Sequence, residues 1–138
     1  MNVMTKKLLD ELTYQIIGAA ITVHKQLGPG LLESVYHRCL HHELSLMDLS
    51  VASEREVPII YKGLRLSADL RCDLLVNDAI IIELKAVESM APIFTAQLLS
   101  YMRLLDIPKG ILINFNCTNI FKDGQKTLVN DLYRQLPP

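Results

Sequence analysis

The chain of 138 residues is 50% hydrophobic and 21% charged, which is the composition of one globular domain and excludes a disordered segment. No uncharged apolar run approaches the ~18 residues that cross a bilayer, and the first residues lack the apolar region of a signal peptide, so we expect a cytoplasmic protein that spans no membrane. Fourteen basic and fifteen acidic residues give a net charge of −1, which excludes the overall basic surface typical of tight, non-specific nucleic-acid binders.

Two amphipathic helices are predicted in the first third of the chain. Over residues 5–27 apolar side chains recur every three or four positions, Thr5 is a suitable N-cap, and a Gly-Pro-Gly sequence at 28–30 ends the pattern. A second helix is predicted over residues 31–47. The faces that we expect to be buried are Leu8, Leu12, Ile16, Ala20, Val23 and Leu27 in the first helix, and Leu32, Tyr36, Cys39, Leu40 and Leu44 in the second.

From residue 50 onward the pattern favours strands. Residues 50–68 predict a hairpin that turns at residues 62–63, and Pro58, which has no N–H to donate, indicates an edge strand. Residues 72–76 and 79–85 predict two further strands. The second of these is so rich in isoleucine that we expect it to be buried on both faces and central in its sheet.

The rest of the chain predicts one more helix and one more strand. The helix is expected from Ser89 to Leu105, the apolar strand over residues 110–115, and a turn at residues 122–124, while the tail up to residue 136 leaves helix and strand open. This order of elements indicates a single α+β domain over residues 1–138, in which helices flank a mixed, mainly antiparallel sheet.

Three charged residues stand in the two strands over residues 72–85. Asp73 lies in the first strand, and Glu83 and Lys85 lie two positions apart in the second, so these two project from one face. Two close carboxylates suit a hard cation such as Mg²⁺ or Mn²⁺, and a neighbouring lysine can orient or activate a water bound to the metal. The alternative is structural, with Lys85 forming an ion pair with one of the two carboxylates.

The pleat of the strands sets a condition for a shared metal. A two-residue turn at Asn77-Asp78 would pair Val76 with the next residue and place the two carboxylates on opposite faces. An odd loop over residues 77–79, with Val76 opposite Ile80, places Asp73 opposite Glu83. The metal hypothesis therefore predicts the odd loop or, failing that, a β-bulge between the two acids.

Weaker signals lie on the predicted helices. Gln97 and Tyr101 are four residues apart, so they share a helix face and are able to hydrogen-bond a phosphate or a bound water, although the pair taken alone favours a core tyrosine with a glutamine at its rim. Glu33 falls in the first turn of its helix, where the macrodipole favours a carboxylate, and it is also a candidate third acid for the same site.

Other kinds of site are not indicated. The three cysteines form no CxxC pair and are expected to be reduced thiols in or near the core. His24 is interpreted as structural, and His37 and His41 lack a third ligand for zinc. The sequence contains no phosphate-binding loop, dinucleotide fingerprint or nucleophile elbow.

Taken together, these segments resemble a known family, the small bacterial GxxExxY proteins, which are similar to nucleases of the PD-(D/E)xK superfamily. The residues that carry the resemblance, in order along nearly the whole chain, are Val23-His24, Gly28 to Tyr36, Val57 to Gly63, Asp73 to Val76, Ile82 to Val87, Gln97 to Tyr101 and Gly110 to Asn114. The resemblance implies a restriction-endonuclease-like fold.

The resemblance also implies roles for the acidic strand residues. Asp73 and Glu83 would hold the metal, Mg²⁺ or Mn²⁺, together with the carbonyl of Leu84. Lys85 would position the attacking water and stabilise charge on the phosphate. The sequence departs from the superfamily at Cys72, which stands where the superfamily name has proline.

Three further residues receive roles in the same way. Glu33 would take the place of the acidic residue on the helix before the sheet. Gln97 and Tyr101 match the QxxxY element of the exonuclease-like branch, which helps to hold the site or the end of the nucleic acid.

We therefore expect a Mg²⁺-dependent enzyme that hydrolyses phosphodiester bonds in nucleic acid, in DNA rather than RNA. The alternative is a non-catalytic module that keeps the fold and binds nucleic acid or another protein. The near-neutral charge favours the alternative, or a nuclease whose basic surface comes from a protein partner or a second subunit.

Overall fold

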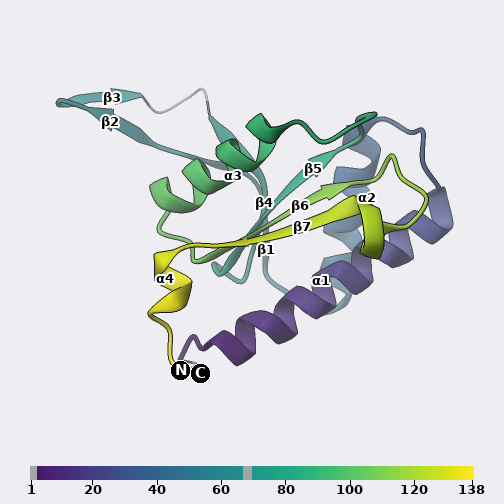
Figure 1. Ribbon diagram of the computed structural model, residues 1–138, viewed down its shortest axis with the longest axis horizontal. Coiled ribbons are helices and arrows are strands. Elements are labelled where there is room, and N and C mark those ends of the chain that lie inside the picture. The colour runs from purple at the N-terminus through teal and green to yellow at the C-terminus, as the bar shows by residue number, and fades with distance from the viewer. Residues whose placement is uncertain (1–2, 67–69) are drawn as a thin grey trace.

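The computed structural model describes residues 3–66 and 70–138, which form a layered α+β structure (Figure 1). The helices are α1 (Lys6–Leu27), α2 (Glu33–Leu46), α3 (Pro92–Leu104), the short α4 (Asp131–Arg134) and a π-helical turn, η1 (Ile120–Gly124). The strands are β1 (Val51–Glu56), β2 (Ile59–Tyr61), β3 (Leu64–Leu66), β4 (Arg71–Val76), β5 (Ile80–Lys85), β6 (Lys109–Asn114) and β7 (Gln125–Val129).

The main sheet confirms the predicted fold class. Within the described residues it has five strands in the order β1-β4-β5-β6-β7, in which β5 and β6 are parallel and the other neighbours are antiparallel. The isoleucine-rich strand β5 is central and buried on both faces, as predicted. Helices α1 and α2 pack on one face of the sheet and α3 packs on the other, so the sheet separates two apolar cores.

The first two helices confirm the predicted elements but correct two buried positions. Thr5 caps α1 by accepting a hydrogen bond from the N–H of Leu8 at 3.1 Å. Leu8 itself is exposed, and Leu9 is buried in its place. Both residues lie at helical spacing from Leu12, so periodicity alone does not choose between them. Leu32 is 73% exposed because it is the extended N-cap residue of α2 and precedes the helix.

The second half of the chain also differs in detail from expectation. Helix α3 begins at Pro92, with Ala91 and not Ser89 at its N-cap, because proline fits the first helical position, where its missing N–H has no intrahelical partner. The turn expected at residues 122–124 is part of η1, and the tail that sequence left open contains β7 and α4. No helix in the described ranges is both long enough and apolar enough to cross a membrane.

Helix α3 lies very close to the sheet at Gly110 in β6. A Cβ atom at this position would lie 2.8 Å from the sulfur of Met102 and 2.9 Å from a methyl carbon of Leu98. Both distances are shorter than ordinary van der Waals contact. The absence of a side chain at residue 110 therefore sets how near α3 lies to β6.

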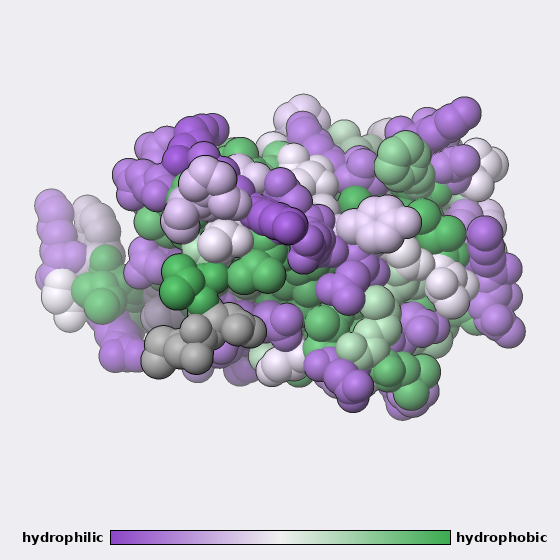
Figure 2. Space-filling view, turned by 90° about the horizontal axis from the view of Figure 1, so that it is seen from below, coloured by the Kyte–Doolittle hydropathy of each residue, from purple (hydrophilic) through white to green (hydrophobic). Residues whose placement is uncertain are grey.

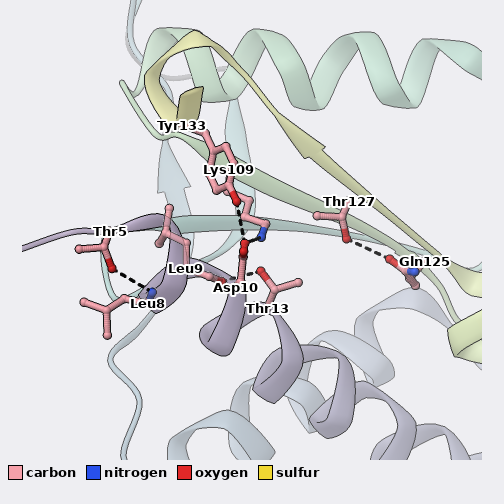
Figure 3. A network of polar contacts seen from close by, with 9 residues as sticks. All are labelled: Thr5, Leu8, Leu9, Asp10, Thr13, Lys109, Gln125, Thr127 and Tyr133. Atoms are coloured by element: carbon pink, nitrogen blue, oxygen red, sulfur yellow. Dashed lines mark hydrogen bonds and ion pairs between the residues drawn. The ribbon is translucent and has the colours of Figure 1, made fainter. Parts of the chain in front are cut away.

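A buried lysine lies at the beginning of β6 and faces Asp10 of α1 (Figure 3). The Nζ atom of Lys109 donates to Oδ1 of Asp10 at 2.8 Å, and the hydroxyl of Tyr133 donates to the same oxygen at 2.8 Å. The hydrogen bond from Lys109, more than any other contact, holds the pKa of Asp10 below its usual value. The charge of Lys109 is thus compensated within the protein.

Strands β2 and β3 form a hairpin of their own outside the main sheet. The predicted turn is confirmed at Lys62 and Gly63, which have φ angles of 47° and 85°. Pro58 lies in the connection between β1 and β2 and not within a strand. Because proline donates no hydrogen bond, the two sheets are separated at this residue.

Candidate active site

The loop between β4 and β5 has the odd length that a shared acidic site requires. Asn77 and Asp78 both have positive φ, and the N–H of Ala79 closes the turn on the carbonyl of Val76 at 2.9 Å. The strand pairing nevertheless joins Val76 to Ile80, so Ala79 is an additional, unpaired residue. The predicted odd loop is confirmed.

The two carboxylates meet where this pairing ends. The last paired residues are Leu74 and Ile82. Beyond them, side-chain carboxylates accept the backbone N–H groups in place of the carbonyls of the opposite strand. The N–H of Asp73 donates to Oε1 of Glu83 at 3.1 Å, and the N–H of Leu84 donates to Oδ2 of Asp73 at 2.8 Å. Each acid therefore binds the backbone of the opposite strand. This fixes the side chains of Asp73 and Glu83 at one end of the β4–β5 pair, which we call the acidic edge.

Glu83 is buried beside a second negative charge. The residue is only 5% exposed, and its carboxyl pKa is raised to about 8, first by burial and then by the charge of Asp73. Hydrogen bonding between the two carboxyl groups contributes in the same direction. Like charges in a dry environment cannot both ionise without cost, so the edge favours a proton or a cation between them.

Lys85 lies near this edge without neutralising it. Its Nζ atom is 4.3 Å from the ring centroid of Phe94 in α3. Among the described residues no ion pair joins Lys85 to Asp73 or Glu83, since the ion pairs within 4.0 Å lie elsewhere. The structural alternative, in which Lys85 is held by one of the acids, is therefore not what the geometry shows.

Helix α3 brings a polar pair toward the same edge. The side-chain N–H of Gln97 donates to the hydroxyl of Tyr101 at 3.0 Å. Burial, followed by the charge of Glu83, raises the pKa of Tyr101. Gln97 and Tyr101 thus lie on one helix face, as expected. The negative charges of Glu83 and Asp73 act on the hydroxyl of Tyr101.

Glu33 approaches the acids from α2. The residue is exposed, but its carboxyl group lies partly against the protein, and burial followed by the charge of Asp73 raises its pKa. The loop before it is held by the buried Tyr36, whose hydroxyl donates to the carbonyl of Gly28 at 2.6 Å and accepts from the N–H of Leu31 at 3.1 Å. The start of α2 is therefore fixed in place by its own second turn.

Strand β4 is distorted beside Asp73. Cys72 and Leu74 are two residues apart and would share a face in a regular strand, yet Cys72 packs on the α3 side and Leu74 on the α1 side. In β1, Glu54 has a φ of 52° between the residues paired with these two. Burial, and then the charges of Glu83 and Asp73, raise the pKa of Cys72 to about 12, so this thiol stays protonated.

Asn114 is a residue near the site that sequence reasoning did not single out. It is buried at the end of β6, and its amide exchanges hydrogen bonds with the N–H and carbonyl of Val87 at 3.1 and 2.9 Å. It pairs with Lys85 across the parallel strands, so it fixes the chain just after the candidate lysine. The signal in the sequence that could have identified Asn114 is a single amide side chain at the end of an otherwise apolar strand.

The histidines and cysteines form no metal site. His24 contacts the backbone carbonyl of Cys117 at 2.8 Å through Nε2, which agrees with a structural role. The three cysteines are free thiols, as expected. In the part of the chain that the structure describes, no three His, Cys, Asp or Glu residues are grouped so as to hold a metal ion. A metal at the acidic edge would therefore need ligands beyond the two strand carboxylates.

A match to a known protein family covers most of the chain. No curated protein and no solved structure matches the chain. A protein family described as the PD-(D/E)XK nuclease superfamily matches residues 10–127, which include β4, β5 and α3 and so the whole acidic edge. Nucleases of this superfamily typically use divalent metal ions. The match extends over well more than half of the sequence, and the chain belongs to the PD-(D/E)XK nuclease superfamily.

Proposed function

We propose that the protein is a metal-dependent nuclease that hydrolyses phosphodiester bonds, in DNA rather than RNA. The observation that carries the proposal is the pair Asp73 and Glu83, each held by the backbone of the opposite strand and joined to no cation by an ion pair within the described residues. Because the chain belongs to a nuclease superfamily, the two carboxylates are candidate metal ligands of a nuclease site. Two fixed carboxylates form the kind of oxygen site that hard divalent cations prefer.

The chemistry of the donors at this edge fits Mg²⁺ or Mn²⁺. One oxygen of each carboxylate accepts a backbone hydrogen bond, and within the described residues no backbone N–H donates to the second oxygen of either. The N–H of Leu84 faces β4, and in an extended strand the carbonyl of a residue points to the same side as its N–H. Asp73, Glu83 and the Leu84 carbonyl would hold the ion, with water and phosphate oxygens as further ligands.

The remaining side chains complete the proposed site. A bound divalent ion supplies Lewis-acid stabilisation of the phosphate and lowers the pKa of water. Lys85, which forms no ion pair in the part of the chain that the structure describes, would hold the attacking water and stabilise the negative charge on the phosphate. Gln97 and Tyr101 would orient the nucleic-acid end from α3, and Glu33 would act as a further acid at the mouth of the site.

Cleavage assays test this proposal directly. Single-stranded and double-stranded DNA and RNA are incubated with the protein in Mg²⁺, in Mn²⁺ and in a chelator. We expect metal-dependent cleavage, strongest on DNA, that is lost in Asp73→Asn. Equal cleavage by the wild type and by this variant would contradict the proposed site.

Calorimetry tests the metal site independently of cleavage. We expect Mn²⁺ to bind the wild type with millimolar or better affinity and to bind Asp73→Asn much more weakly. Because the raised pKa of Glu83 keeps this group largely protonated at pH 7, binding should release a proton, so the measured heat should differ between buffers of different ionisation enthalpy. Identical heats for the two proteins would rule the site out.

The near-neutral charge supports a second candidate, a module that keeps the fold and binds nucleic acid or a protein without cleaving. Binding of Mn²⁺ without cleavage of any of the four substrates would favour this candidate. A nuclease that takes its basic surface from a partner or a second subunit would instead become active when that partner is present.

A further inference from the structure

The β2–β3 hairpin extends away from the rest of the molecule. Figure 1 shows it as an arm beyond the sheet and the helices, and in Figure 2 the same arm stands out at the left with both apolar and polar surface. Its strands pair only with each other in the described residues. The arm thus has two faces open to solvent.

The surface of the arm is apolar and basic. Ile59 pairs with Leu66 and Tyr61 with Leu64, so these four side chains share one face, and all but Ile59 are exposed. Tyr61 is 61% exposed, and the Nζ atom of Lys62 lies 5.5 Å from its ring centroid. The only charged residues in the sequence from 57 to 66 are Lys62 and Arg65, both basic.

This chemistry fits unpaired nucleotides better than a second copy of the chain. An exposed aromatic ring gives a base a face to stack on, and two cations in a segment whose sequence, residues 57–66, contains no acid attract phosphate. A stable dimer buries roughly 800 Å² on each partner, which a few half-exposed side chains on three-residue strands do not provide. Two like charges on the arm would also repel those of a second copy.

The arm begins close to the candidate acidic edge. The pairing of β1 with β4 continues to the bond from the N–H of Val57 to the carbonyl of Leu70 at 2.8 Å, three residues before Asp73. At ~3.3 Å per extended residue and ~5 Å between neighbouring strands, the path from Asp73 through Leu70 and Val57 to Tyr61 is about 28 Å. A strand bound at the edge would need only a few nucleotides to reach Tyr61.

We propose that the β2–β3 hairpin is a binding arm for unpaired nucleotides of the nucleic acid that the acidic edge acts on. The identity of this ligand rests on the proposed function. Tyr61 stacks on a base, Lys62 and Arg65 contact phosphates, and the apolar face of Leu64 and Leu66 excludes water beside the stacked base.

A matched pair of variants tests this role. Tyr61→Ala/Lys62→Ala removes an exposed aromatic–lysine pair from the arm, and Phe121→Ala/Lys122→Ala removes the equivalent pair from η1, at the right of Figure 1, where Phe121 is 65% exposed. Binding is measured by fluorescence anisotropy with a labelled oligothymidylate of ~20 nucleotides, longer than the roughly 4–16 that single-strand modules cover. A chelator is present, so binding is measured without metal-dependent cleavage.

We expect the arm variant to bind about tenfold more weakly or worse and the η1 variant to bind as the wild type does. The arm variant should also lose about 0.7 from the slope of log affinity against log salt. Tyr61→Trp, which keeps an aromatic face, should retain binding. Thermal melts establish that each variant is folded.

Several outcomes would overturn the proposal. Wild-type affinity in the arm variant, or equal losses of affinity in the arm and η1 variants, would do so. Tighter binding of duplex DNA than of single-stranded DNA by the wild type would also contradict it. A sedimentation coefficient that differs between the wild type and the arm variant would assign the arm to a protein contact. Failure of the proposed function looks different. Binding through the arm without any metal-dependent cleavage would support the binding role of the arm and contradict the proposed nuclease function. Metal-dependent cleavage with unchanged binding by the arm variant would contradict only the role of the arm.

Discussion

Two buried ionisable groups lie at opposite ends of the parallel strands β5 and β6, and their surroundings differ. At one end Lys109, paired across the strands with Ile80, is neutralised by Asp10, which also accepts a hydrogen bond from Tyr133. At the other end Glu83 lies beside a second carboxylate, Asp73, and no lysine of the described residues forms an ion pair with it. Both groups are about equally inaccessible to solvent.

The difference separates a buried group whose charge is compensated from one whose charge is not. Burying a charge is costly unless a partner compensates it, and Lys109 has such a partner. Glu83 gains a backbone contact, a repulsive neighbour and a weaker attraction from Lys85, so its ionised form is not compensated by its surroundings. We infer that compensation for Glu83 comes from outside the chain, and the predictions below test this contrast.

The largest expected effect is on cleavage by Asp73→Asn. Removing one of the two proposed metal ligands should lower the cleavage rate by about a thousandfold or more, because metal ions supply several kcal/mol of transition-state stabilisation. The melting temperature of the metal-free variant should not fall, because the repulsion on Glu83 is relieved. The matched change Asp10→Asn should leave cleavage unchanged, and a loss of similar size there would erase the contrast.

Lys85→Ala is expected to reduce cleavage by about a hundredfold, the usual effect of removing one group that stabilises transition-state charge. The free energy of unfolding should change by less than about 1 kcal/mol, because Lys85 contributes only a contact with the ring of Phe94. Cleavage rates and denaturant titrations measure the two quantities. A loss of 3–5 kcal/mol in stability would instead identify Lys85 as the partner of a buried ion pair.

Asp10→Asn should act on stability alone. It leaves Lys109 buried without a countercharge, and we expect a loss of about 1–3 kcal/mol in the free energy of unfolding. The loss is smaller than for a fully buried pair because the Asp10 side chain is 57% exposed. Urea titration with a cleavage assay on the same preparation provides the check, and a fully stable variant would show that the network in Figure 3 contributes little.

The last expected difference between the two buried groups is in the pH dependence of stability. Folding raises the pKa of Glu83 from its ordinary 4.5 to about 8, so the folded metal-free protein holds a proton that the unfolded chain loses between these values. Stability should therefore fall as the pH rises through this window, and Glu83→Gln should flatten the slope. The pKa of Asp10 is lowered, so its contribution should disappear only as the pH falls below its ordinary 3.8.

Sequence alone was sufficient for much of the acidic edge, because local rules determine it. The two-residue period of a strand places Glu83 and Lys85 on one face, and the same period shows that a shared site with Asp73 needs an odd loop. The helix period places Gln97 beside Tyr101. Each of these predictions depends on neighbours in the chain and not on long-range packing.

Features that depend on distant segments were not predictable in this way. The network of Lys109 joins residues 99 positions apart, and the distortion at Glu54 depends on how β1 meets β4. The partner of Lys85 is a ring on α3, whose position over the sheet no local pattern gives. The roles of the site residues remain predictions, which the variants above are designed to test.

The missing side chain at Gly110 has a consequence for helix α3. At this point α3 rests on β6 through the side chains of Leu98 and Met102, on the helix that also carries Tyr101. In Gly110→Ala the added methyl group would force these two side chains to shift. One methyl group at residue 110 would thus disturb the packing beneath Tyr101, without altering any residue that is proposed for the site.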